Sequence, residues 1–410
     1  MKCRHCHTAL DEVRDVFVDL GTAPPSNAYL READLAQAET YFPLKVLTCP
    51  ECRLVQVDEV QRHDAMFSDD YLYFSSYSPS WLEHAERYVA EVVDRLELDA
   101  NSLVMEVASN DGYLLQYVAQ RGIACVGVEP TSSTAVVARA KGITTITEFF
   151  GAEFAKDFKA KQRPVDLVLG NNVLAHVPDI NDFVAGFREV LSPKGTVTVE
   201  FPHLMQLVQQ GQFDTVYHEH FSYLSLHTVQ RIFAAQGLTV WDVQTLPTHG
   251  GSLRVWAQHE ANSRAATTRV AEVLAAEAAA GMRSLDFYRG LQARIDAIKN
   301  DLLGFLIAQK RAGKTVAAYG AAAKGNTLLN YAGVRSDLLP YVVDASPHKQ
   351  GRWLPGSRIP VVAEAHLREM KPDYVVILPW NLRDEIVEQL GYVRQWGGKF
   401  VTAVPSLRVD

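Results

Sequence analysis

Short apolar runs alternate with amphipathic stretches through the middle of the chain. Four runs have the length and composition of buried strands: SLVMEVA, ACVGVEP, VDLVLGNN and GTVTVEFP. Between them, apolar residues recur at helical spacing in YLLQYVAQRG, STAVVARAKG and FVAGFREVLSP. Strands that alternate with helices in this way predict a doubly wound parallel sheet. LTVWDVQTLP and GSLRVWAQ, which flank a short THG segment, predict an antiparallel hairpin at the end of that sheet.

Two further changes of pattern divide the rest of the chain. The Ala-rich stretch from Asn262 to Lys314 predicts a continuous helical spacer. TVAAYG, LPYVVDA and DYVVILPW then predict three more buried strands with helices between them. We therefore predict an α/β protein with a small N-terminal module (1–64), a central Rossmann-like domain (65–261), a helical connector (262–312) and a second, C-terminal Rossmann-like domain (313–410).

Composition and charge narrow the function classes. The chain has 410 residues and a formal net charge of -8, which gives no long-range attraction for a phosphate backbone. The N-terminal MKCRHCHTAL has no apolar signal core, and no apolar run is long enough to span a bilayer. We expect a cytoplasmic protein that binds neither nucleic acid nor membrane and needs no obligate protein partner.

Cysteines are few, and most of them are paired in the sequence. Two CxxC pairs provide four candidate ligands for a structural Zn²⁺: Cys3, Cys6, Cys49 and Cys52. Four protein thiolates leave no open coordination position, so the predicted role is structural. The alternatives are free thiols, a redox pair, or His5 or His7 as a substitute ligand. Cys125 lies within a predicted strand and is interpreted as a small core residue.

Polar residues follow the first two strands of the central domain. Ser109, Asn110, Asp111 and Gly112 form a strand-to-helix loop, where open α/β sheets bind ligands. Glu129 ends the next strand, about twenty residues later, where an acidic side chain can accept hydrogen bonds from both ribose hydroxyls. Because the GxGxxG fingerprint is absent, this spacing favours an adenosine cofactor over a dinucleotide.

Several motifs together resemble a known family. EVASNDG resembles the first motif of class I methyltransferases, with Glu106 and Gly112 at matching positions and Ala108 and Asn110 in place of two glycines. GNNVLAHVPD resembles the segment after the fourth strand of those enzymes. With the CxxC pairs, FDTVYHEHFSYLS, YGAAAKGNTLLN and LPWN, nearly the whole chain resembles the sugar C-methyltransferases of deoxysugar pathways. The resemblance implies a zinc-binding N-terminal part, a class I methyltransferase fold and a C-terminal Rossmann-like part.

The resemblance also implies residue roles. The predicted S-adenosylmethionine site comprises Glu106, Ser109, Asn110, Gly112, Glu129, Asn171 and Asn172. The predicted reaction centre comprises Tyr71, His176, Tyr217, Glu219 and His220. Family members methylate a ring carbon next to the ketone of a nucleotide-linked sugar.

Such a reaction explains the need for these side chains. A carbon beside a ketone is weakly acidic, so it needs a base and a donor for the enolate oxygen. His220 is the candidate base, because imidazole has an ordinary pKa of about 6.5. Glu219 can orient a partner or act as the base itself, and Tyr217 or Tyr71 can donate to the oxygen.

Other interpretations of these residues remain open. In an extended segment Tyr217 and Glu219 would face one way and His218 and His220 the other, so one pair can be structural. His218 and His220 can also form an HxH metal pair. Tyr71 and the neighbouring Tyr73 can pack between domains, and His176 can be a capping residue.

The C-terminal domain carries a candidate diphosphate site. TVAAYG leads into a predicted helix whose start contains Gly320, Lys324, Gly325 and Asn326. The last three are the predicted substrate-binding residues, and a scaffold without ligand is the alternative. His348, Lys349 and Arg352 are interpreted as an ordinary solvated loop, and Asn381 as the cap of the helix that follows it.

The sequence thus predicts transfer of a methyl group from S-adenosylmethionine to the carbon beside the ketone of a nucleoside-diphosphate keto-deoxysugar, with dTDP as the favoured carrier. The alternatives are an O- or N-methyltransferase of another small molecule and an inactive zinc-containing interaction protein.

Overall fold

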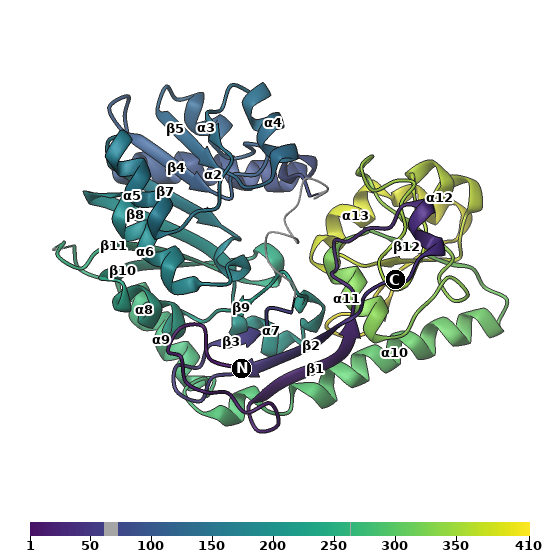
Figure 1. Cartoon of the computed structure of the whole chain (residues 1–410). Coiled ribbons are helices and arrows are strands. Elements are labelled where there is room, and N and C mark those ends of the chain that lie inside the picture. The colour runs from purple at the N-terminus through teal and green to yellow at the C-terminus, as the bar shows by residue number, and fades with distance from the viewer. Residues whose placement is uncertain (61–72, 263) are drawn as a thin grey trace.

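The computed structural model describes residues 1–60, 73–262 and 264–410. Figure 1 shows two lobes joined at their base by the N-terminal strands and the long helix α10. None of the described helices is both long enough and apolar enough to cross a membrane.

The N-terminal module is built on an antiparallel sheet in the order β1-β2-β3-β9. Its own strands are β1 (Val16–Ala23), β2 (Phe42–Thr48) and β3 (Val55–Val57). The fourth strand, β9 (Ser222–Tyr223), comes from the central domain and pairs with β3. The module is therefore integrated into the central domain by backbone hydrogen bonds and does not stand apart as a separate unit.

The central domain contains a seven-stranded sheet in the order β10-β11-β8-β7-β4-β5-β6. Its strands are β4 (Leu103–Val107), β5 (Ala124–Val128), β6 (Thr145–Ile146), β7 (Val165–Asn171), β8 (Leu191–Pro202), β10 (Leu238–Leu246) and β11 (Ser252–His259). Its helices are α2 (Pro79–Leu96), α3 (Leu115–Ala119), α4 (Ser132–Ala140), α5 (Ala152–Lys161), α6 (Ile180–Val190), α7 (Leu204–Gln210) and α8 (Leu226–Ala235).

The predicted parallel sheet and its closing hairpin are confirmed. β4, β5, β6, β7 and β8 pair in parallel, and β10 and β11 add an antiparallel edge. Helix α2 shows why the sequence folds this way, since Ser78 caps its first turn and its buried residues recur at helical spacing. Strand β6 and helix α5 were not predicted, because their segment has only a short apolar run and a highly charged helix.

The connector is two helices and not one continuous helix. α9 (Thr268–Ala279) and α10 (Leu291–Arg311) are separated by a short 3-10 turn. Gly281 and Gly290 flank that turn with φ values of +90° and +84°. Glycine adopts this left-handed backbone at little cost, so two glycines end one helix and begin the next where Ala-rich composition alone predicted continuity.

The C-terminal domain is a second α/β unit with a sheet in the order β14-β13-β12-β15-β16-β17. Its strands are β12 (Val316–Tyr319), β13 (Val342–Val343), β14 (Val361–Val362), β15 (Tyr374–Ile377), β16 (Lys399–Thr402) and β17 (Arg408–Val409). Its helices are α11 (Ala323–Tyr331), α12 (Glu364–Met370) and α13 (Arg383–Gln389). All pairs except β16–β17 are parallel, as expected for a Rossmann-like unit.

A shared apolar core fixes how the parts meet. Residues of β1 and β2 such as Phe17 and Leu44 belong to the same buried cluster as Ile295 of α10 and Leu328 of α11. The cysteines of the N-terminal module, called the zinc module below, belong instead to a buried cluster shared with the central domain. The N-terminal module therefore packs against both α/β domains, and the space between those domains has walls from all three.

Candidate active site

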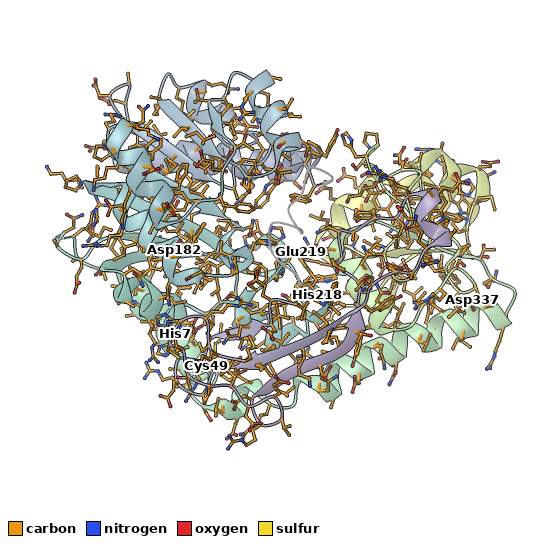
Figure 2. The ribbon with its side chains drawn as sticks, viewed as in Figure 1. His7, Cys49, Asp182, His218, Glu219 and Asp337 are labelled. Carbon is orange, nitrogen blue, oxygen red and sulfur yellow. The ribbon has the colours of Figure 1, made fainter. Side chains whose placement is uncertain are left out.

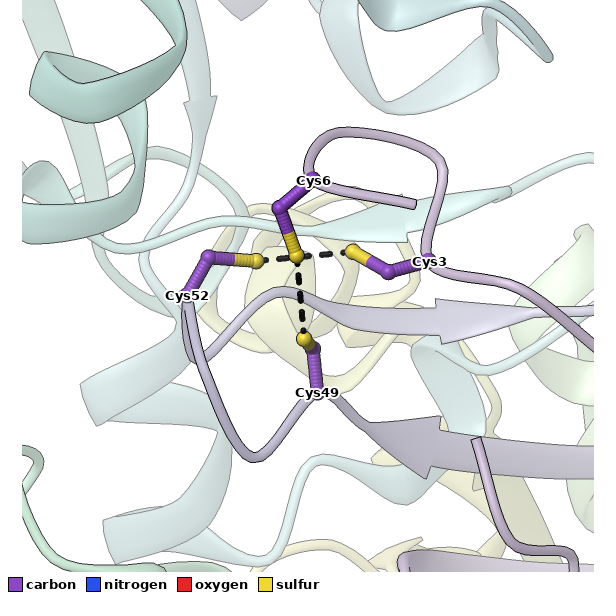
Figure 3. Close-up of side chains that lie close together, drawn as sticks. All are labelled: Cys3, Cys6, Cys49 and Cys52. Carbon is purple, nitrogen blue, oxygen red and sulfur yellow. Dashed lines mark hydrogen bonds between the residues drawn. The ribbon is translucent and has the colours of Figure 1, made fainter. Parts of the chain in front are cut away.

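The four cysteines predicted to bind zinc converge on one point (Figure 3). Their Sγ atoms lie within 4.8 Å of one another, and the Cys3–Cys52 and Cys6–Cys49 pairs are 3.4 Å apart. These separations are too long for disulfide bonds and fit the edges of a small thiolate tetrahedron. Three of the four side chains are buried, so the residues fit a structural Zn²⁺ with no open coordination position.

The alternative ligands His5 and His7 are not part of this cluster. His5 Nδ1 lies 2.9 Å from Asn181 Oδ1 on helix α6, and His7 is exposed. Figure 2 shows His7 on the outside of the molecule, away from the space between the lobes. The zinc site is therefore a four-cysteine site.

The loop after β4 keeps the left-handed turns that glycines would provide. Ala108, Asn110 and Gly112 have φ values of +55°, +49° and +74°. A Cβ atom at Gly112 would lie 3.2 Å from Ile143, so a side chain there would crowd its neighbours as well as strain the backbone. Two hydrogen bonds fix the loop, since the backbone nitrogens of Asn110 and Thr131 donate to opposite oxygens of Glu129 at 2.9 Å.

Polar groups on this loop face a cavity of about 800 Å³. Asn110, Glu129, Asn171 and Asn172 line it, as the cofactor prediction requires. Each oxygen of Glu129 accepts one backbone hydrogen bond and has room for a ribose hydroxyl. The side-chain oxygens of Asn171 and Asn172 are buried and accept no hydrogen bond within the described residues. Such buried acceptors fit the ammonium group of a methionine moiety.

Three predicted cofactor residues lie behind the cavity wall. Glu106 is buried in β4, and burial holds its pKa well above the ordinary value. Ser109 packs beneath β5, where a Cβ at Gly127 would come within 2.3 Å of its Oγ. Gly112 shapes the loop. None of the three is among the described residues that line the cavity, so the structure brings only four of the seven to it.

Tyr217 and His220 form a hydrogen-bonded pair on the same cavity wall. The segment is a turn, closed by the His220 nitrogen donating to Tyr217 O at 3.0 Å. His220 Nδ1 donates to Thr215 O at 2.8 Å, so the neutral ring accepts at Nε2 from the Tyr217 hydroxyl at 2.7 Å. Burial lowers the pKa of His220 well below its ordinary value. The site therefore holds a neutral imidazole with its basic nitrogen at the cavity.

The turn overturns the interpretation that an extended segment would put Tyr217 and His220 on opposite faces. His218 points away from both, and its Nε2 donates to Pro43 O at 3.1 Å. The prediction of an HxH metal pair is wrong, because one ring nitrogen of each histidine donates a hydrogen bond to a backbone carbonyl oxygen and the two rings point apart. In the described part of the chain, the four-cysteine cluster is the one group of three or more candidate ligands close enough to hold an ion.

His176 joins the pair from the segment after β7. It lines the cavity, and its ring lies 4.6 Å from the ring of His220, centroid to centroid. Burial lowers its pKa to about 4, so it is neutral near pH 7. Tyr71, the fifth predicted member of the reaction centre, lies outside the described residues. Tyr73 lines the cavity, and its backbone oxygen accepts from Asn110 Nδ2 at 3.1 Å.

Glu219 is buried and does not line the cavity among the described residues. Figure 2 shows it in the region between the two lobes. Its two oxygens accept from the backbone nitrogen and Nδ2 of Asn27, at 3.3 and 3.1 Å. Burial raises the pKa of Glu219 to about 7.

The C-terminal domain contributes Lys324 to the cavity. Its Nζ donates to Asn381 Oδ1 at 3.0 Å and lies 4.9 Å from the centre of the Trp380 ring. Asp214, on the central-domain side, accepts from Trp380 Nε1 at 2.7 Å. Burial lowers the pKa of Lys324, which Asp214 opposes, and burial raises the pKa of Asp214 to about 6.

Other predictions for this domain need correction. Asn381 does not cap helix α13 but binds Lys324, and both line the cavity. Asn326 is buried at an interface, where its Nδ2 donates to Ser26 O at 2.6 Å, and Gly325 packs against Leu378. Among the described residues neither lines the cavity. Gly320 approaches Pro379 so closely that a Cβ would lie at 2.3 Å.

The loop interpreted as solvated carries contacts with both domains. Lys349 lines the cavity, and its Nζ donates to Ala321 O at 2.8 Å. His348 is exposed, yet its ring stacks on Phe74 at 4.9 Å and its Nε2 lies 2.9 Å from the Tyr77 hydroxyl. No pattern in the sequence predicts these contacts, because the partners of His348 lie more than 270 positions away and Lys349 binds a backbone oxygen, which carries no residue-type signal.

Sequence reasoning also missed Asn27, Asp214 and His249. Asn27 and His249 line the cavity, and Asp214 faces Lys324. Asn27 follows PPS in the N-terminal module, and His249 lies in the THG turn, where polar residues are ordinary. The unusual φ of +55° at His249 is a structural signal that the sequence alone does not show.

The cavity lining and the four clustered cysteines fit a zinc-containing methyltransferase that uses S-adenosylmethionine. Family models support each part. One described as a zinc binding domain matches residues 3–67, one described as a methyltransferase domain matches residues 81–243, and one described as a C-methyltransferase C-terminal domain matches residues 247–405.

The C-methyltransferase NovU of Streptomyces niveus is 36% identical over 408 residues, which cover 100% of this chain and 96% of that protein. The chain therefore belongs to this family of C-methyltransferases. Among solved structures, magnesium protoporphyrin IX methyltransferase from Synechocystis PCC 6803 is 16% identical, over 43% of this chain and 82% of its own, with a TM-score of 0.35. The PH0226 protein from Pyrococcus horikoshii OT3 is 14% identical, over 46% and 94%, with a TM-score of 0.38.

Proposed function

We propose that the protein methylates the carbon beside the ketone of a nucleotide-linked keto-deoxysugar, with dTDP as the favoured carrier. The observation that carries the proposal is the neutral Tyr217–His220 pair in a cavity that also has Glu129 on its central-domain wall and Lys324 on its C-terminal wall. A base, a cofactor wall and a cation for a diphosphate are the three things this reaction needs.

The protein groups divide the work as follows. Glu129, Asn110, Asn171 and Asn172 hold S-adenosylmethionine, which supplies the methyl group when bound. His220 removes the proton from the carbon beside the ketone, because its Nε2 is unprotonated and at the cavity.

Tyr217 serves the ketone oxygen. Its hydroxyl donates to His220 Nε2 in the free protein and can turn to the ketone oxygen of a bound sugar, which frees Nε2 for the proton. His176 is neutral near pH 7, so its ring packs beside His220 without adding a positive charge there. Tyr71 is proposed as a second donor on the strength of the family resemblance.

The C-terminal domain binds the nucleotide part. Lys324 has one donor engaged by Asn381 and two left for phosphate oxygens. Lys349 adds a second cation to the same wall. Of the residues predicted at this helix start, we retain Lys324 as the direct ligand and assign Gly325 and Asn326 to the fold that presents it.

The five cysteines, none of which is in a disulfide, support a reducing compartment, and we propose the cytoplasm.

The test is calorimetric titration of the zinc-loaded protein with S-adenosylmethionine, repeated with thymidine diphosphate present. Binding of both ligands, followed by mass-spectrometric detection of methylated product from a panel of dTDP-linked keto-deoxysugars, is the expected result. Cofactor binding with no response to any nucleotide diphosphate would point to a different acceptor and overturn the nucleotide-sugar assignment.

A further inference from the structure

A short segment of the zinc module is wedged between the two α/β domains. In residues 24–30, Ser26 O accepts from Asn326 Nδ2 at 2.6 Å, and the Tyr29 hydroxyl donates to Ala321 O. Leu30 and Trp353 exchange two backbone hydrogen bonds of 2.9 Å. The C-terminal domain therefore holds this segment on both sides of Asn27.

Asn27 and Glu219 form a hydrogen-bonded pair. Of the two, only Asn27 is among the described residues that line the cavity. Both nitrogen donors of Asn27 are used on Glu219, at 3.3 and 3.1 Å. Because the amide nitrogen faces the carboxyl group, the amide oxygen is directed away from it. That oxygen makes no hydrogen bond within the described part of the chain, so the pair presents an acceptor to the cavity.

An acceptor at Asn27 complements the donors that the described residues place on the C-terminal and Tyr217 side of the cavity. Tyr217, Lys324 and Lys349 are donors, which suit a ketone oxygen and phosphate oxygens. A deoxysugar also carries hydroxyl or amino hydrogens, and one that is buried on binding needs an acceptor to replace water. Asn27 supplies one, and Glu219 cannot do so directly because its side chain is buried behind the amide.

We propose that Asn27 of the zinc module binds the sugar through its Oδ1, as acceptor for a ring hydroxyl or amino group, and that Glu219 positions this amide and is not the base. The inference rests on the proposed function and deepens it. It also gives the zinc module a direct part in substrate recognition, because residues 24–30 continue from β1, and β1 pairs with β2, which leads directly into Cys49.

The test is a double-mutant cycle with Asn27→Ala, Glu219→Gln and the double variant, using a dTDP-linked keto-deoxysugar that the wild-type protein methylates. KM for the sugar is expected to rise about three- to tenfold in Asn27→Ala, the usual effect of one uncharged hydrogen bond, while kcat stays within about threefold. Glu219→Gln is expected to raise KM by no more than that, and to add nothing in the Asn27→Ala background.

Asn181→Ala is the matched control. Asn181 also ties the zinc module to the central domain, through Nδ2 hydrogen bonds to Arg4 O and His5 O at 3.2 and 2.9 Å, but does not line the cavity. Its KM is expected to equal that of the wild type even if its melting temperature falls. Should Asn27→Ala not fold, Asn27→Leu keeps the side-chain volume, removes the same acceptor and is expected to show the same rise in KM.

Three results would overturn the inference. A fall in kcat of about a hundredfold or more for Glu219→Gln in both backgrounds would make Glu219 the base. Equal KM values for the Asn27 and Asn181 variants would leave Asn27 a purely structural residue. Failure of the wild-type protein to methylate any dTDP-linked keto-deoxysugar would overturn the proposed function, and this inference with it.

Discussion

Replacing Tyr217 by Phe removes one hydroxyl group from the reaction centre and little else. The Tyr217 ring packs against His220 with their centroids 3.9 Å apart, and a phenyl ring keeps that contact. What is lost is the donor that lies 2.7 Å from His220 Nε2 in the free protein and that we assign to the ketone oxygen when the sugar is bound.

The two consequences of this change differ in size. In the free protein, water in the cavity can replace the lost donor to Nε2, so the free energy of unfolding should fall by no more than about 1 kcal/mol. In the reaction, the oxygen gains negative charge as the carbon loses its proton. Loss of one preorganised donor to such an oxygen typically lowers kcat by about 10²–10³-fold, or about 2.7–4 kcal/mol.

The assay is steady-state methyl transfer at saturating S-adenosylmethionine, with the thermal midpoint measured on the same preparation. We expect a loss of about 10²–10³ in kcat, a change in KM of less than about threefold, and a nearly unchanged midpoint. A Tyr217→Phe variant with kcat within about threefold of the wild type would refute the role of this hydroxyl in oxygen stabilisation.

Three other predictions follow from the site. Cys49→Ser should release Zn²⁺, seen as loss of the one equivalent in metal analysis, and lower the thermal midpoint; retention of the metal would contradict the four-cysteine site. Burial holds the pKa of His220 below its ordinary 6.5, so the base stays unprotonated as the pH falls toward that value. The acid limb of a plot of kcat/KM against pH should therefore lie below pH 6.5, and a limb at or above that pH would be contrary evidence. Lys324→Met should leave the affinity for S-adenosylmethionine unchanged and weaken thymidine diphosphate binding about tenfold or more in calorimetry, because a charge-assisted hydrogen bond is lost. An unchanged affinity for thymidine diphosphate would remove Lys324 from the nucleotide site.

The central sheet and the zinc ligands could be predicted because their signals are local. Buried strands such as β7 are nearly continuous apolar runs, and a CxxC pair brings its own two ligands together. The strand-to-helix loop was also predictable, and Asn110 keeps a left-handed φ of +49° where the motif in other methyltransferases has glycine. Its hydrogen bond to Glu129 stabilises that conformation.

The arrangement of the reaction centre was less accessible. The alternation expected of an extended segment separated Tyr217 from His220. The chain instead turns there, and His220 Nδ1 donates to the Thr215 carbonyl oxygen. The Asn27–Glu219 contact joins positions 192 apart, and the Asp214–Trp380 contact joins positions 166 apart. Such contacts depend on how three folded units pack together, which periodicity within one segment does not encode.

Base-assisted carbon methylation is tested most directly by solvent deuterium exchange. The wild-type protein would be incubated in D₂O with a dTDP-linked keto-deoxysugar and S-adenosylhomocysteine, and the sugar analysed by NMR. The account predicts deuterium at the carbon beside the ketone, at a rate that His220→Asn lowers by about 10²-fold or more. Exchange that is equally fast in His220→Asn, or no exchange in a wild-type protein that still methylates the sugar, would contradict it.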